Sequence, residues 1–120
     1  MSKALTATAI AAAIADMPKS HTTMPHPSLG GDINIKIHTC AEREEFEQKV
    51  YGADSQFKDY PNRAVVFAHA VVDDKGDRLF NDKQIPTIAN WPAHITMPVF
   101  NKYNELNLIG PGKVAAAEKN

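Results

Sequence analysis

The side chains that could do metal, nucleophilic or acid–base chemistry are few in this chain and poorly placed for it. The 120 residues include five histidines and one cysteine. No two histidines have the spacing of a helix-borne zinc site, and a single cysteine adds little to them. Cys40 lies two residues after His38, but Thr39 between them is predicted to start a helix, which leaves no thiolate–imidazole pair. We therefore expect no catalytic residue, no metal and no cofactor, and we interpret the protein as a non-enzyme.

Four aspartates gather between residues 73 and 82 and invite comparison with a calcium-binding loop. An EF-hand loop needs oxygen ligands at its first, third and fifth positions, glycine at the sixth and glutamate at the twelfth. Counted from Asp73, the third, sixth and twelfth positions hold lysine, arginine and glutamine. The match fails, so we interpret residues 73–78 as a solvated reverse turn in which Gly76 supplies the positive φ.

Composition limits the classes of partner. The formal net charge is −1 and the pI is 6.5, without a basic stripe, which argues against nucleic acid. No apolar run approaches the ~18 residues that a membrane span requires. The alanine-rich N-terminus is weakly similar to a signal peptide, which would make the chain a small secreted binding protein. We favour a surface helix over residues 4–17, with Ile10, Ile14 and Met17 on one stripe.

The first half of the chain shows three local patterns. Residues 18–31 hold three prolines and two adjacent glycines, typical of a linker or extended arm. Residues 32–38 alternate, with isoleucines on one face, and this predicts a half-buried strand. Thr39 and Glu42 then form a capping box that begins a helix ending near Gly52, with Phe46 inward and Glu45 paired with Lys49 on its surface.

The second half of the chain predicts three helices. Residues 63–72 are apolar except for Arg63 and His69, and we interpret His69 as a hydrogen-bonded core residue. The valines there favour a strand, whereas the length and Asn62 as a cap favour a helix, which is our choice. Residues 81–90 predict a short helix capped by Asn81, and residues 93–106 predict the last helix, with Pro98 kinking it or delaying its start.

Together these patterns predict an α+β fold, a mostly α-helical small single domain with a short β element around residues 32–38 and a tight turn at 73–78. We divide the chain into an N-terminal helix and Pro/Gly-rich arm (1–31), a globular domain (32–110) and a flexible C-terminal tail (111–120).

The turn and its flanks carry a family resemblance. The run Val71-Val72-Asp73-Asp74-Lys75-Gly76-Asp77-Arg78-Leu79-Phe80 is followed by Asn81-Asp82-Lys83-Gln84-Ile85, then by Phe100 and Leu106-Asn107. This order resembles the tail assembly chaperones of long-tailed bacteriophages. Its turn motif consists of Asp73, Asp74, Gly76, Arg78 and Phe80. The strand and acidic helix of residues 33–46 extend the likeness, which departs at Pro86, at Pro98 and throughout residues 1–31.

The resemblance implies a function in viral tail morphogenesis. Such a chaperone binds the phage tape-measure protein, helps recruit tail-tube subunits and can self-associate. It acts in the host cell cytoplasm and is absent from the mature virion. The alternative within the same setting is a structural tail or virion component.

A chaperone of this kind needs an exposed apolar patch of several hundred Å². We predict that this partner-binding surface draws on five residues: Ile10, Ile14, Trp91, Phe100 and Tyr103. Core packing is the alternative for each aromatic residue, and for Phe80 and Phe100 it is the favoured one.

Overall fold

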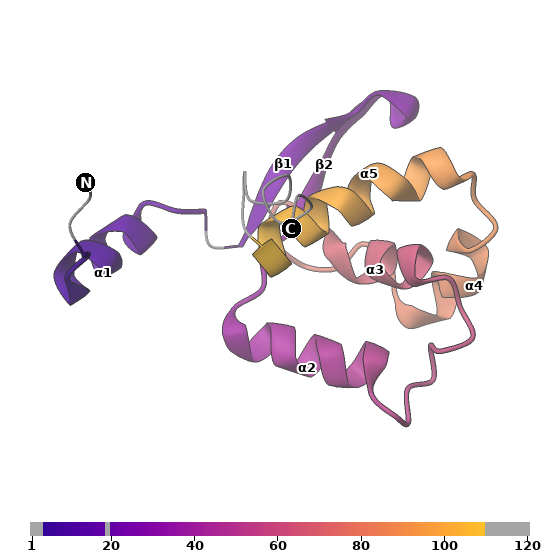
Figure 1. Ribbon diagram of the computed structural model, residues 1–120. Helices are drawn as coiled ribbons and strands as arrows, with labels where there is room; N and C mark the ends of the chain where they lie inside the picture. Colours follow the sequence, from indigo (N-terminus) through magenta and orange to yellow (C-terminus); the bar gives the residue numbers. More distant parts are fainter. Residues whose placement is uncertain (1–3, 19, 110–120) are drawn as a thin grey trace.

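The computed structural model of the protein describes residues 4–18 and 20–109, and in this part the chain forms a small α+β domain with an N-terminal helix beside it (Figure 1). The predicted fold class is confirmed. In chain order the helices and strands are α1 (Ala7–Ala15), β1 (His21–His26), β2 (Gly31–Lys36), α2 (Cys40–Tyr51), α3 (Asn62–Ala70), β3 (Val71–Val72), α4 (Ile85–Ile88) and α5 (Ala93–Asn104). The predicted C-terminal tail, residues 111–120, lies outside the described residues.

The strands form an antiparallel sheet in the order β1-β2-β3. The alternation predicted for β2 is confirmed, because Ile35 is fully buried and Ile33 packs against the core from the same face. Helices α3 and α5 lie on this side of the sheet, and α3 lies between α5 and α2 (Figure 1). The core therefore forms where the sheet meets these helices.

Strand β1 was not predicted, because its prolines suggested an arm. Ile37 donates a backbone hydrogen bond to Ser20 (2.9 Å), and His21 pairs with Lys36. In this antiparallel register every second residue of β1, starting at Thr22, forms backbone hydrogen bonds with β2. Pro25 falls at an outward position of this edge strand, where no N–H is needed. The N-terminal arm is thus shorter than predicted and ends before β1.

Helix α2 matches its prediction closely. Thr39 accepts the N–H of Glu42 (3.1 Å), and the Glu42 carboxylate accepts the N–H of Thr39 (2.9 Å), which completes the capping box. Phe46 and Val50 are buried, and Gly52 is the C-cap. The predicted surface pair of Glu45 with Lys49 does not form, because Lys49 binds Asp82 instead (3.0 Å).

The apolar run at residues 63–72 is both a helix and a strand. Helix α3 ends at Ala70, and the two valines that follow form β3, where Val71 pairs with Ile35. The predicted cap was wrong by one residue: Pro61 is the N-cap, and Asn62 accepts a hydrogen bond from the Tyr51 hydroxyl (2.8 Å). Proline suits this place because a helix start needs no N–H there.

The last helix begins at Ala93 despite Pro98, and a π-helical turn at Glu105–Ile109 follows it. Asn107 on that turn joins the end of α5 to the segment after β2. Its Oδ1 accepts the N–H of His38 (2.6 Å), and its Nδ2 donates to the carbonyls of Lys36 (2.9 Å) and Tyr103 (3.1 Å). A single side chain thereby fixes the position of His38 relative to α5.

Candidate functional site

Helix α1 is the most exposed apolar element of the described chain. Thr6 caps it by accepting the N–H of Ala9 (3.1 Å), but none of its residues is buried. The side chains of Ile10 and Ile14 are 45% and 54% exposed. Residues 4–15 carry no charge, and the helix lies apart from the domain (Figure 1). The sequence-predicted pair Ile10 and Ile14 therefore forms an apolar face with no partner within residues 4–18 and 20–109.

The three predicted aromatic contact residues lie elsewhere. Tyr103 is 0% exposed, so it contributes no surface and this part of the prediction is wrong. Phe100 is half-buried beneath the Arg63 guanidinium, which lies 5.6 Å from its ring. Trp91 is half-buried against Phe67, with ring centroids 5.5 Å apart. The structure therefore does not join the aromatics with α1 in one patch.

The predicted motif turn is a braced reversal. The Asp73 carboxylate accepts the N–H groups of Lys75 (2.8 Å) and Asp77 (3.0 Å). Asp74 accepts a hydrogen bond from the Asn34 side chain on β2 (3.0 Å). Gly76 has φ +89°, as predicted, and a Cβ there would lie 2.5 Å from the Ser20 hydroxyl. Glycine is thus required by the backbone conformation, and a larger residue would also displace the Ser20 hydroxyl.

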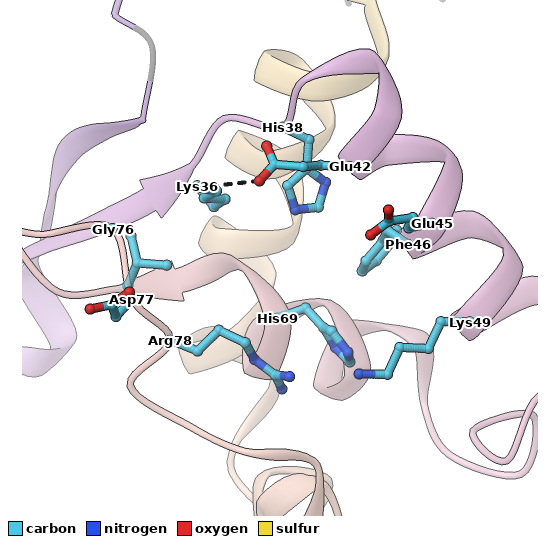
Figure 2. Close-up of a pocket in the computed structure, with 11 residues that line it drawn as sticks. Lys36, His38, Glu42, Glu45, Phe46, Lys49, His69, Gly76, Asp77 and Arg78 are labelled. Carbon is cyan, nitrogen blue, oxygen red and sulfur yellow. Dashed lines mark ion pairs between the residues drawn. The ribbon is translucent and has the colours of Figure 1, made fainter.

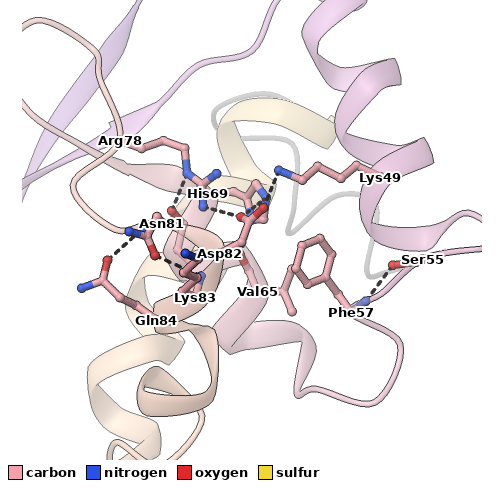
Figure 3. Close-up of polar contacts among 11 residues, drawn as sticks. Lys49, Ser55, Phe57, Val65, His69, Arg78, Asn81, Asp82, Lys83 and Gln84 are labelled. Carbon is pink, nitrogen blue, oxygen red and sulfur yellow. Dashed lines mark hydrogen bonds and ion pairs between the residues drawn. The ribbon is translucent and has the colours of Figure 1, made fainter.

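Arg78 and Phe80 attach this turn to α3. The Arg78 Nε donates to the carbonyl of Ala68 (3.0 Å), and its Nη2 donates to Asp82 (2.9 Å) (Figure 3). Phe80 packs on Phe67 and Trp91, with ring centroids 5.6 and 5.7 Å away. The motif residues therefore act in packing and positioning, as we expected for Phe80.

A cleft of about 460 Å³ lies between α2, the end of β2 and the motif turn (Figure 2). Its lining residues are Lys36, His38, Glu42, Glu45, Phe46, Lys49, His69, Val72, Gly76, Asp77 and Arg78. The Phe46 ring lies between the imidazoles of His38 and His69. The centroid of each imidazole is 5.4 Å from the centroid of the Phe46 ring. No local sequence pattern predicts this cleft, because its walls are distant in the chain.

His69 is the most buried polar residue in the cleft, at 8% exposed. Its Nδ1–H donates to the carbonyl of Val65 (2.8 Å), which leaves Nε2 of the neutral ring as a bare acceptor. This Nε2 is buried and has no hydrogen-bond partner among residues 4–18 and 20–109, and Asp82 Oδ1, another acceptor, lies 3.4 Å from it. Burial lowers the pKa of His69 to about 4, and the charges of Arg78 and Lys49 act in the same direction.

Asp82 is the centre of the charges beneath the cleft (Figure 3). Its carboxylate binds Lys49 on α2 at 3.0 Å and Arg78 of the turn at 2.9 Å. Burial alone would raise the pKa of Asp82, but the hydrogen bonds from Lys49 and Arg78 outweigh it and lower the pKa below its usual value. One carboxylate thereby ties the motif turn to α2.

At the other end of the cleft, His38 is held by Tyr103. Arg43 donates to the Tyr103 hydroxyl (2.8 Å), and the same hydroxyl shares a hydrogen bond with Nδ1 of His38 (3.0 Å). Burial lowers the pKa of His38 and raises that of Tyr103 to about 12. At neutral pH the cleft therefore holds two uncharged imidazoles, and Nε2 of His69 carries no proton.

The neutral state of His69 predicts a pH dependence of stability. Its pKa is 6.5 in the unfolded chain and about 4 in the folded one, so the unfolded chain takes up the proton first as the pH falls. Between pH 7.5 and pH 5 this should lower the free energy of unfolding by about 2 kcal/mol. Urea unfolding at both pH values should show this loss in the native chain and a smaller one in His69→Phe. An equal loss in both chains would contradict the assignment to His69.

Within residues 4–18 and 20–109, no three histidine, cysteine, aspartate or glutamate side chains converge as a metal site would need. In the same part of the chain no helix has the length and apolar character to cross a bilayer.

Comparison with known proteins finds no similar protein: no family model, no curated protein sequence and no solved structure matches this chain.

Proposed function

We propose that this protein is a non-enzymatic tail assembly chaperone of a long-tailed bacteriophage. It binds the tape-measure protein through α1 and helps to recruit tail-tube subunits during tail morphogenesis in the host cytoplasm. The observation that carries this proposal is the uncharged helix α1, which presents Ile10 and Ile14 to solvent outside the domain. The turn motif at residues 73–80, on which the family resemblance depends, supports it.

A helix of this kind needs a partner to be stable. Isolated helices shorter than about 12–15 residues are marginal in water, and α1 has nine residues with no buried side chain. Its small alanines allow another helix to approach closely, and its isoleucines at i and i+4 supply an apolar stripe. The best complement is therefore another apolar helix, which is the kind of surface that a tape-measure protein offers.

The size of α1 limits the strength of one such contact. Nine residues span roughly 13 Å and bury only a few hundred Å², compared with roughly 800 Å² per partner in a stable complex. One copy should thus bind weakly, and many copies along a long rod should gain strength through avidity. Weak individual contacts also let tail-tube subunits displace the chaperone.

Co-expression tests this function directly. The tape-measure protein of the same phage should move from the insoluble to the soluble fraction when both are produced together, and it should co-purify with the chaperone. An unrelated long helical protein serves as the control and should gain no solubility. Unchanged tape-measure solubility, together with no complex on pull-down, would argue decisively against the proposal.

The alternative function is that of a structural tail or virion component of the same kind of phage. Mass spectrometry of purified phage particles separates the two, because an assembly chaperone leaves the finished tail. Peptides of this chain in stoichiometric amounts in the particle would reject the chaperone in favour of a structural protein.

A further inference from the structure

Helix α1 and the residues after it carry an apolar stripe with the spacing of a paired helix. Its four members follow one another at intervals of three, four and three residues: Ala7, Ile10, Ile14 and Met17. The three large side chains are 45%, 54% and 57% exposed, in chain order. The helix stands away from the domain (Figure 1), and none of its side chains is buried within the described part of the chain. A stripe of this spacing fits a second helix lying alongside at a small angle.

The stripe is complementary to itself when two copies of α1 run in opposite directions. With residue 12 of each copy at the twofold axis, Ile10 of one copy faces Ile14 of the second copy, and the reverse. Ala7 then faces Met17 of the second copy, so that a small residue meets a large one at each end of the stripe. Six of the nine residues of α1 are alanine, which lets the two backbones approach closely.

The charges at the ends of α1 favour the same direction. The helix has no acidic residue in its first turn and no basic residue in its last, and its C-cap is Asp16. A negative charge at this end opposes the helix dipole. In the antiparallel arrangement Asp16 lies at the level of Thr8 of the second copy, in a first turn where the dipole favours a negative charge. A parallel pair would instead bring two copies of Asp16 to the same end, together with the two domains that begin at β1.

From the stripe and these end charges we propose that α1 pairs with α1 of a second copy of this chain, as an antiparallel helix pair. The pair stabilises a helix that is marginal in water by itself, and it covers Ile10 and Ile14. The pair itself does not depend on the proposed function. Its consequence does rest on that function, because a tape-measure protein would have to compete with the second copy for the same stripe.

The size of the contact sets the strength of the pair. Helices of nine residues bury only a few hundred Å² per copy, well below the roughly 800 Å² per partner of a stable complex. We therefore expect a reversible dimer with a dissociation constant of about 0.1–1 mM. A dimer of this strength allows α1 to exchange its second copy for another apolar helix.

Sedimentation equilibrium of the full chain alone tests the pair at concentrations up to about 1 mM. The average mass should rise from that of the monomer towards that of the dimer. Ile14→Asp should weaken the pair at least about tenfold, because it places a charge opposite Ile10 of the second copy. Ala12→Asp is the matched control and should leave the pair intact, since residue 12 lies on the opposite side of the same helix at 100° per residue. Neither residue is buried, so the domain should keep its fold, and the ¹⁵N–¹H spectrum of each variant checks this.

A spin label reads the direction of the pair. The exposed Cys40 is first replaced by serine, and a nitroxide is attached to the variant Thr8→Cys. This chain is mixed with ¹⁵N-labelled chain that carries no nitroxide. An antiparallel pair should broaden the amide signals around Asp16 most strongly, whereas a parallel pair would broaden those around Thr8.

Three results would overturn the assignment. They are a monomeric mass at every concentration, a dimer that Ile14→Asp leaves intact, and strongest broadening around Thr8. The experiment contains no tape-measure protein, so it is independent of the co-expression test. A monomeric chain that still co-purifies with the tape-measure protein would reject the pair and leave the proposed function standing. A dimer that fails to bind the tape-measure protein would do the reverse.

Discussion

Replacing both Ile10 and Ile14 with aspartate should abolish the ability of this protein to keep the tape-measure protein soluble. Each isoleucine contributes roughly 1.5–3 kcal/mol when it is fully buried against a partner. Together they should account for most of the affinity of so short a helix. A loss of about 3–5 kcal/mol corresponds to at least a hundredfold weaker binding, since each 1.4 kcal/mol is a factor of ten.

The matched control places the same charge on the other side of the same helix. Thr8 and Ala12 lie opposite the isoleucine stripe at 100° per residue, so Thr8→Asp/Ala12→Asp adds two charges there without removing apolar surface. Co-purification of the tape-measure protein should survive in this variant. Thermal unfolding of the domain should be unchanged in both variants, because no side chain of α1 is buried.

Opposite outcomes are easily distinguished. If the isoleucine variant still binds, α1 is not the contact and the half-buried aromatics Trp91 and Phe100 become the next candidates. If both double variants lose binding equally, the effect comes from charge on the helix and not from its apolar face.

Tyr103→Ala should cost roughly 3–5 kcal/mol of unfolding free energy, as expected for a fully buried aromatic side chain. The loss combines a cavity beside Phe46 with the removal of a hydroxyl that joins Arg43 to His38. Domains of this size are usually stable by about 5–15 kcal/mol, so the variant should unfold at much lower urea concentrations.

Tyr103→Phe separates packing from hydrogen bonding. It keeps the ring and should cost only about 1–2 kcal/mol, the range for a lost buried hydrogen bond. Urea titration followed by circular dichroism measures both variants. If the phenylalanine variant is as unstable as the alanine variant, the hydroxyl network and not the ring is what stabilises this part of the core.

Several elements were predictable because their signals are local. Thr39 and Glu42 lie within one helical turn, so their capping box can be read directly from the sequence. The alternation in β2 and the glycine of the motif turn are local in the same sense. The exposed stripe of α1 was predictable too, because an alanine-rich helix has few large apolar side chains that could pack against the domain.

The errors arose where distant residues decide the outcome. Pro25 argues against a strand in isolation, but it is accommodated because β2 pairs with the other edge of β1. Lys49 has Glu45 within reach along α2, yet it binds Asp82, which also holds Arg78. Tyr103 was predicted to be a surface residue, and only the packing of α5 against β2 and α2 buries it.

By itself, the sequence determined the α+β class, the capping box of α2, the reverse turn and the exposed apolar helix α1. These features depend on hydrogen bonds and side-chain periodicity within a few residues, so neighbouring letters suffice to specify them. Only the tertiary structure decided that His69 and Lys49 meet at Asp82 beneath the cleft, and that one nitrogen of His69 has no donor within the described part of the chain. The physical reason is that burial and charge pairing depend on which residues the folded chain brings together, and these three lie on separate elements.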